Sequence, residues 1–351
     1  MSNIKSILFY ETVRPLKVTF STSLGKRDVI KSVIVKVRLD NGCVGIGECP
    51  TSFVLKNETV LRIRAILNKA AAALIKKPAS ECQKEIKILR SRFKAYPMTI
   101  SGLEVALFRA CLASENTPEH KYWGGALTSL KTDITIPFIV DAVLLDRWLG
   151  YTKSVGFSSF KLKVSGDIEA DKTYISRVYE KLKTLSDDFT IRLDGNQGFN
   201  EKSFLQLTDF VEKNGYKIEL FEQPLPKDAY RGFTEIKKRS PIPIILDETV
   251  FTTLDFVRVI DENMCHGVNI KVAKSGVAES ARIFSMAKQN GMKLMVGCMT
   301  ETITGLSAGI YLALGTGGFD FIDLDAVHLL RHKKRYGNLL IDGPCYTIND
   351  C

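Results

Sequence analysis

Short runs of β-branched and apolar residues alternate with helix-forming stretches from about residue 133 onward. Eight such runs follow one another, and helical stretches separate most of them. Eight alternations favour a closed parallel barrel, a (β/α)8-type (TIM-like) fold of the α/β class, over an open doubly wound sheet. The predicted strands cover residues 135–140, 159–164, 190–194, 218–222, 242–247, 268–271, 293–297 and 319–323.

The first part of the chain has a different pattern. Residues 32–39 alternate in the manner of a strand, and Asp40-Asn41-Gly42 forms a hairpin turn into a second strand at residues 44–47. Predicted helices follow at residues 58–75, 81–93 and 100–113. We therefore expect an α+β domain over residues 1–125, a barrel over residues 126–325, and a C-terminal segment, residues 326–351, that packs back on the first domain.

Composition narrows the choice of partners. The formal net charge is +10, but the basic residues are scattered, and the densest cluster is one run from Arg331 to Arg335. Nucleic acid is not an expected partner, because no basic stripe is interleaved with aromatic residues. No apolar run reaches the ~20 residues that cross a bilayer, and the first residues lack a signal-peptide core. The eight cysteines form no CxxC pair, so we expect no zinc site and a cytoplasmic location.

Carboxylates stand at the ends of three successive predicted barrel strands. Asp194, Glu222 and Asp247 end the third, fourth and fifth strands, spaced by one strand–helix unit each. The C-terminal ends of barrel strands face the active site, so these side chains are expected to converge. Three unpaired carboxylates in one cleft repel one another, which makes a divalent cation their natural partner. Hard oxygen ligands with open positions suit Mg2+.

Lysines flank this predicted metal site. Lys161 and Lys163 are two positions apart on the second strand, so both side chains point to the same face. Lys271 ends the sixth strand, on the opposite side of the barrel mouth. A neighbouring cation lowers the pKa of a lysine, and a neutral lysine can act as a base near pH 7. Two bases on opposite faces of one carbon would invert a stereocentre.

The same residues carry a resemblance to a known family. The motifs are KLK at 161–163, LDGNQGF at 193–199, EQP at 222–224, DET at 247–249, NIK at 269–271, MVGCMTET at 295–302 and DLD at 323–325, with GxGE at 45–48 and YWGG at 122–125 in the first domain. In this order they resemble the enolase superfamily and, within it, the muconate-lactonising subgroup. The resemblance covers nearly the whole chain and implies that residues 1–125 form a capping domain.

The resemblance also implies a metal centre. One Mg2+ per subunit would be held by Asp194, Glu222 and Asp247, and Asn196 and Glu248 would support these ligands. The ion would bind the substrate carboxylate and stabilise the enediolate that forms when the α-proton leaves.

Further residues receive roles from the same resemblance. Lys163 and Lys271 would be the two catalytic acid/base residues, and Lys161 would hold the substrate carboxylate. Thr135 and Cys298, at the ends of the first and seventh strands, would line the substrate pocket.

The DLD motif distinguishes the reactions of the subgroup. Similar acids at the end of the eighth strand mark the dipeptide epimerases, where they bind the free α-ammonium of the substrate. Asp323 and Asp325 suit a cation, although they could instead pair with a basic side chain. The predicted reaction is epimerisation at the C-terminal residue of an L,L-dipeptide, giving the L,D form. We expect a dipeptide as the substrate, a homo-oligomer, and no membrane or nucleic-acid partner.

Three other functions stay open. N-acylamino acid racemase, o-succinylbenzoate synthase and cycloisomerase substrates have no free ammonium, so Asp323 and Asp325 would lack a role in these reactions. A non-catalytic metal-binding barrel is disfavoured by the lysines on both sides. Residues 305–309 match the GxSxG of a serine hydrolase, with Asp325 and His328 downstream, but Ser307 is expected inside the helix after the seventh strand.

Two positions depart from the family pattern. The loop of residues 22–27 resembles the one that closes over the substrate, and relatives specific for an acidic second residue carry Arg where this chain has Gly25. Ala-Glu specificity is therefore not expected unless Lys26 or Arg27 substitutes. Arg109 stands at a helix position where relatives have Asp, and we interpret that position as structural.

Overall fold

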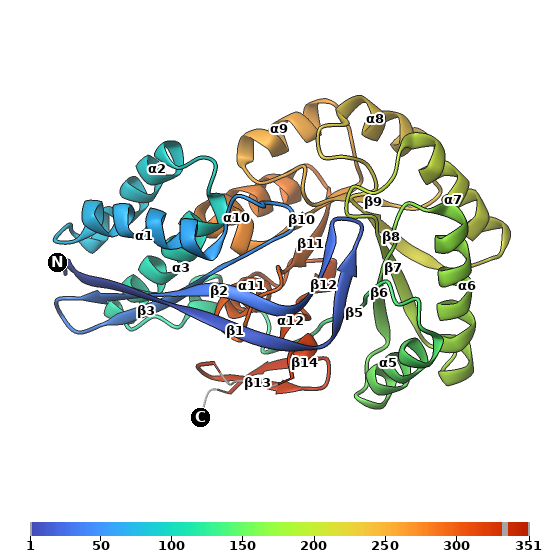
Figure 1. Ribbon diagram of the computed structural model, residues 1–351. Coiled ribbons are helices and arrows are strands. Elements are labelled where there is room, and N and C mark those ends of the chain that lie inside the picture. Colours follow the sequence, from blue (N-terminus) through green and yellow to red (C-terminus); the bar gives the residue numbers. More distant parts are fainter. Residues whose placement is uncertain (1, 332–335, 350–351) are drawn as a thin grey trace.

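The computed structural model describes residues 2–331 and 336–349. A barrel and an N-terminal α+β domain lie side by side, and the first hairpin of the α+β domain reaches toward the barrel (Figure 1). The predicted fold class is confirmed. Residues 332–335 of the basic run fall outside the described residues. Within the described part of the chain, no helix is both long enough and apolar enough to cross a membrane.

The N-terminal domain is built on an antiparallel sheet of three strands. β1 (Ile4–Thr22) pairs with β2 (Gly25–Leu39), and β2 pairs with β3 (Val44–Pro50) across the predicted turn. Alternate residues of β2, among them Val33, Val35 and Val37, are fully buried in the core shared with the helices. The helical elements are α1 (Val60–Leu74), η1 (Ala79–Glu81), α2 (Cys82–Arg92), α3 (Pro97–Ser114) and α4 (Glu119–Tyr122).

Helix α3 packs closely on β3. A Cβ at Gly47 would lie 2.0 Å from the carbonyl oxygen of Gly102, and a Cβ at Gly45 would lie 2.0 Å from that of Ala106. Glycine is required at both positions, because backbone meets backbone there. This contact fixes β3, which carries Glu48 toward the barrel.

Eight parallel strands form the barrel in sequence order, each starting within two residues of its predicted start. The N–H of Asp133, just before the first strand, donates to the carbonyl of Ile322 in the last strand at 3.2 Å, which joins the two ends. The first strand is shorter than predicted, because Pro137 has no N–H to donate. The strands are β5 (Ile134–Ile136), β6 (Ser159–Lys163), β7 (Thr190–Asp194), β8 (Ile218–Glu222), β9 (Ile244–Leu246), β10 (Gly267–Ile270), β11 (Lys293–Gly297) and β12 (Phe321–Asp323).

Helices cover the outside of this barrel (Figure 1). Their inner faces form one apolar core with the strands. The helices are α5 (Ala142–Ser154), α6 (Ile168–Leu185), α7 (Glu201–Lys213), α8 (Tyr230–Arg239), α9 (Thr253–Asp261), α10 (Val272–Gln289) and α11 (Ile303–Thr316), followed by the short α12 (Ala326–Leu329).

The barrel interior has an apolar layer below a charged layer. Leu220, Ile245, Met295 and Phe321 form one buried cluster. Strand side chains alternate with a period of two, so the residues two positions further on point the same way. The residues two positions after Leu220, Ile245 and Phe321 are acidic and buried. They are Glu222 on β8, Asp247 just after β9 and Asp323 on β12.

Arg109 joins the two domains. Its Nη1 donates to the carbonyls of Ile46 and Thr304, each at 2.9 Å, and its Nη2 donates to Ser307 Oγ at 2.8 Å. It also pairs with Glu119 at 2.7 Å. Its role is structural, as interpreted from the sequence. Ser307 is fully buried inside α11 rather than exposed on a strand–helix turn, so the serine hydrolase does not fit.

Glu48 makes a second link between the domains. Its carboxylate accepts hydrogen bonds from Thr302 N at 3.0 Å, Thr302 Oγ1 at 2.5 Å and Gly305 N at 3.0 Å. These groups belong to the first turn of α11, whose N–H groups have no partner within the helix. The N-terminal domain therefore caps a barrel helix.

The last part of the chain contacts both domains. Arg331 N donates to the carbonyl of Pro15 in β1 at 3.2 Å. β13 (Leu339–Asp342) and β14 (Cys345–Ile348) form a small antiparallel sheet with β4 (Ser129–Lys131), which precedes the barrel. The domain boundaries at residues 125 and 325 stay predictions.

Candidate active site

A cavity lies where the barrel strand ends meet the β1–β2 turn. Ten of the twelve residues singled out from the sequence line this cavity. The other two, Asp194 and Glu222, are fully buried, and both contact Lys161, which lines the cavity. Lys161 thus links Asp194 and Glu222 to the residues that line the cavity, whereas the carboxylates whose oxygens all lie within 4.8 Å of one another in the described part of the chain are those of Asp133, Asp323 and Asp325. The ten that line the cavity are Thr135, Lys161, Lys163, Asn196, Asp247, Glu248, Lys271, Cys298, Asp323 and Asp325.

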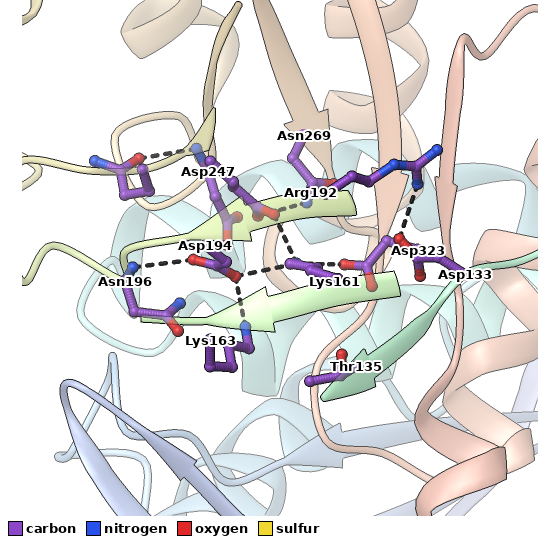
Figure 2. A network of polar contacts seen from close by, with 12 residues as sticks. Asp133, Thr135, Lys161, Lys163, Arg192, Asp194, Asn196, Asp247, Asn269 and Asp323 are labelled. Carbon is purple, nitrogen blue, oxygen red and sulfur yellow. Dashed lines mark hydrogen bonds and ion pairs between the residues drawn. The ribbon is translucent and has the colours of Figure 1, made fainter. Parts of the chain in front are cut away.

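Lys161 stands at the centre of a network of charges (Figure 2). Its Nζ lies 2.6 Å from Glu222 Oε2, 2.7 Å from Asp323 Oδ2 and 3.0 Å from Asp194 Oδ2. Burial lowers its pKa, but the surrounding carboxylates, Asp323 first, raise that pKa well above its ordinary value. Lys161 is therefore a fixed cation that links the predicted metal ligands to the DLD motif.

The two predicted bases approach from different sides. Lys163 Nζ lies 2.5 Å from Asp194 Oδ2, and Lys271 Nζ lies 2.6 Å from Asp247 Oδ2 and 3.9 Å from Glu222 Oε1. Lys163 ends β6 and Lys271 follows β10, with β7, β8 and β9 between them in the strand order. In a barrel of eight strands this separation is half a turn, so the two lysines project from opposite sides of the barrel mouth.

Carboxylates around Lys271 oppose the lowered pKa that the sequence predicts for a lysine beside a bound cation. Burial lowers its pKa, but Asp247 and Glu222 raise it further, and the net value is above the ordinary one. Asp247 shows the reciprocal effect: burial raises its pKa, but Lys271 and Lys274 lower it more. The carboxylates that hold Lys271 therefore oppose the effect of the neighbouring cations on its pKa.

Lys274 was missed by the sequence analysis. Its Nζ donates to Asp247 Oδ1 at 2.6 Å and to the Asp247 carbonyl at 2.5 Å, and its side chain is buried. It lies three positions after Lys271, the extended residue that precedes α10, and belongs to the first turn of that helix. That spacing was the available signal. Asp247 is thus held by two lysines at once.

Several buried oxygens at the site have no hydrogen-bond partner. They are Glu222 Oε2, Glu248 Oε2 and Asn196 Oδ1, although the first lies within ion-pair distance of Lys161. Burial and the charge of Asp247 raise the pKa of Glu248 to about 8. Buried polar atoms are normally paired, so unpaired oxygens among carboxylates indicate room for a cation. This donor set, hard oxygen atoms only, fits Mg2+.

The loops after β7 and β8 have a strained backbone. Asn196, Gln197 and Gln223 have φ angles of 39°, 70° and 36°, in the left-handed region that side chains disfavour. Two of these residues hydrogen-bond predicted metal ligands: Asn196 N donates to Asp194 Oδ1 at 2.9 Å, and Gln223 Oε1 accepts from Asp247 N at 2.8 Å. The strain orients two predicted metal ligands, which is where such strain typically occurs.

A second acidic group lies at the seam of the barrel. Carboxylate oxygens of Asp133, Asp323 and Asp325 lie within 4.8 Å of one another, all buried. Asp133 was not singled out from the sequence, because it precedes a strand rather than ending one. Arg192 Nη1 donates to Asp133 at 2.8 Å, and Thr135 N donates to Asp325 at 2.6 Å. Burial and Asp323 raise the pKa of Asp325.

The β1–β2 turn covers the cavity. Ser23 Oγ lies 3.1 Å from the Gly195 carbonyl and 2.7 Å from the Asn196 carbonyl, which ties the turn to the loop after β7. The turn contributes Thr22 and Leu24 to the cavity wall, and Phe53 contributes from the segment after β3. The N-terminal domain therefore supplies the outer wall of the site.

The fold and site define the class of protein. Residues 4–122 match the mandelate racemase/muconate lactonizing enzyme N-terminal domain, and residues 144–350 match the enolase C-terminal domain-like family. The chain belongs to the mandelate racemase/muconate lactonizing enzyme family of the enolase superfamily, so the family resemblance is confirmed.

Individual relatives are similar over nearly their full length. The L-Ala-D/L-Glu epimerase of Thermotoga maritima is 29% identical over 99% of this chain and 98% of its own. The aromatic dipeptide epimerase of Herpetosiphon aurantiacus is 30% identical over 96% of this chain and 93% of its own. A substrate-liganded structure of the L-Ala-D/L-Glu epimerase from Bacillus subtilis superposes with a TM-score of 0.92, at 27% identity, over 99% of this chain and 96% of that one.

Proposed function

We propose that this protein is a magnesium-dependent epimerase that inverts the α-carbon at the C-terminal residue of an L,L-dipeptide. The observation that supports it most is the pair of lysines, 163 and 271, that stand on opposite sides of the barrel mouth, each paired with a predicted metal ligand. The relatives named as dipeptide epimerases support the substrate class.

Asp194, Glu222 and Asp247 would hold the ion, with Asn196 and Glu248 beside them. When bound there, Mg2+ supplies Lewis-acid stabilisation of the negative charge that develops on the substrate carboxylate. Glu248 has a buried oxygen without a hydrogen-bond partner, and this supports its place beside the ion.

Lys161 would bind the substrate carboxylate, because it is a buried cation at the centre of the site. Lys163 and Lys271 would share the proton transfers: one, as the amine, takes the α-proton, and the other, as the ammonium, donates a proton to the opposite face. The total charge of the two lysines is the same before and after turnover. An ion bound to Asp247 would weaken the hold of that carboxylate on Lys271 and would lower the pKa of Lys271 toward the range needed for a base.

Asp323 and Asp325 would bind the α-ammonium of the dipeptide. Both are buried, both line the cavity, and Asp133 adds a third carboxylate next to them. Asp323 pairs with Lys161 and Asp133 with Arg192, whereas Asp325 has no ion pair in the described part of the chain, so a cationic group of the substrate is favoured next to Asp325. A free ammonium distinguishes a dipeptide from the N-acylated substrates of the alternative reactions.

The test is α-proton exchange in D2O with Mg2+ and a panel of L,L-dipeptides, followed by mass spectrometry and NMR. Deuterium should enter the C-terminal α-carbon, and the L,D form should accumulate. N-acetylation of the same dipeptides should reduce kcat/KM at least ~100-fold, because two or more charge-assisted hydrogen bonds are lost. Efficient exchange of N-acylated amino acids with none of dipeptides would support an alternative reaction instead.

Single lysine variants test the two-base step. K163A should lose exchange of the α-proton from one epimer and keep it from the other, and K271A should show the reverse selectivity. K238A, at an exposed helix position, is the matched control and should behave as the wild type. Equal loss of both exchange reactions in each variant, with folding intact, would contradict a base on each face.

A further inference from the structure

Arg27 differs from the other cations of the cavity wall. Four lysines line the cavity, and each has a carboxylate partner within 4.0 Å: Lys161, Lys163, Lys271 and Lys274. Arg27 lines the same cavity and has no carboxylate partner among residues 2–331 and 336–349. Partly buried charges are normally paired, so a guanidinium in this position calls for an anion.

Arg27 is nevertheless held in place. Its Nη1 donates to the Thr51 carbonyl and to Thr300 Oγ1, each at 3.0 Å, and its guanidinium lies 4.0 Å from the ring centre of Phe53. Nε and Nη2 have no acceptor in the described part of the chain. Burial lowers the pKa of Arg27, and no neighbouring acid offsets this effect. The side chain is therefore oriented by neutral groups, with donors left over.

The neighbouring positions do not offer a competing cation. Lys26 is exposed and does not line the cavity. At Gly25 an added Cβ would lie 3.1 Å from the Phe53 ring, so that ring occupies the space next to the glycine. Arg27 is two positions beyond Gly25 on β2, on the same face of the strand, and it contacts the same ring.

We infer that Arg27 is a specificity-determining residue and that its guanidinium binds an acidic side chain of the dipeptide. This inference rests on the proposed epimerase function. A guanidinium presents two parallel donors to a carboxylate, and such a pair excludes the amide isostere, which would direct an N–H group at the cation. The apolar residues around Arg27, Phe53 and Leu24 among them, would contact the methylene groups of the acidic side chain.

The test compares acidic dipeptides with their amide isosteres, using full-length protein, Mg2+ and deuterium exchange. The substrates are L-Ala-L-Glu, L-Ala-L-Gln, L-Glu-L-Ala and L-Gln-L-Ala, with L-Ala-L-Phe as an apolar reference. The wild type should prefer the acidic member of one pair by about 100-fold in kcat/KM, the equivalent of two charge-assisted hydrogen bonds. The position of the preferred glutamate identifies which residue of the dipeptide faces Arg27.

Two variants at position 27 and one control complete the design. R27M should remove the acidic preference and keep exchange of the amide and apolar dipeptides, whereas R27K should retain part of the preference. K26M removes the same charge one position away and should leave the preference unchanged. The wild-type comparison does not depend on how well R27M folds, and R27K preserves the charge if R27M is unstable.

The possible failures are distinguishable. No exchange of any dipeptide by the wild type would refute the proposed function itself. Exchange of L-Ala-L-Phe or of the amide dipeptides at least as fast as the acidic ones would refute the role of Arg27 and leave the epimerase in place. A preference for acidic dipeptides that survives in R27M with unchanged size would also overturn it.

Discussion

Replacing Arg109 by methionine should destabilise the protein strongly, and by a mechanism that can be measured. Its side chain is 6% exposed and pairs with Glu119, whose side chain is 9% exposed. It also donates to two backbone carbonyls and to Ser307. R109M leaves the Glu119 carboxylate buried without its cation, and breaking a buried pair in this way costs about 3–5 kcal/mol.

The pH dependence of this loss follows from Glu119. Burial raises its pKa, and Arg109 lowers it again. Without Arg109 the folded-state pKa of Glu119 rises further above the unfolded value. Stability that depends on a raised carboxyl pKa is present below the unfolded pKa and is lost as pH rises through the folded pKa. The difference in unfolding free energy between wild type and R109M should therefore be smaller at pH 5 than at pH 8.

Urea unfolding, followed by circular dichroism, measures these free energies. The double variant R109M/E119M removes both charges, so it should be more stable than R109M alone and should yield a coupling energy of about 2 kcal/mol or more. R192M, which leaves Asp133 buried without its cation inside the barrel, is a matched comparison that does not join the domains. Additive effects of R109M and E119M, or a loss independent of pH, would refute the reasoning.

Three further predictions concern other parts of the molecule. Glu58 accepts hydrogen bonds from Met98 N and Thr99 N at the start of α3, and burial raises its pKa to about 7. The stability of the wild type relative to E58Q should therefore fall by about 3 kcal/mol from pH 4 to pH 8. A difference in unfolding free energy that does not change with pH, measured by urea unfolding, would contradict this. K274M removes two hydrogen bonds to Asp247 and should weaken Mg2+ binding by roughly 10–100-fold, which a Mg2+ titration of deuterium exchange measures, with K238A as control. EDTA should abolish deuterium exchange and added Mg2+ should restore it; exchange that persists in EDTA would argue against a metal-dependent reaction.

The barrel and most of its site could be predicted because two simple periods govern them. Strand–helix units of similar length put Asp194, Glu222 and Asp247 at successive strand ends, and the strand period of two put Lys161 and Lys163 on one face. In the structure, Lys161 and Lys163 both contact Asp194, and Lys161 also contacts Glu222. Neither inference required knowledge of contacts distant in sequence.

The residues that were missed depend on contacts between distant segments. Asp133 lies beside Asp323 and Asp325 only because the barrel closes between its first and last strands. Lys274 reaches Asp247 from a helix, where a lysine usually faces water. The pKa of Lys271 depended on which carboxylates surround its amine, and a sequence does not specify such distances.

The contact of Glu48 with α11 has a consequence for how the molecule unfolds. The N–H groups at the start of this barrel helix find their acceptor in β3 of the other domain. A barrel produced without the first 125 residues would leave those groups without that acceptor and would expose Ser307 and the Thr304 carbonyl, which Arg109 now covers. These shared contacts couple the unfolding of the two domains, so calorimetry of the intact chain should show one cooperative transition rather than two.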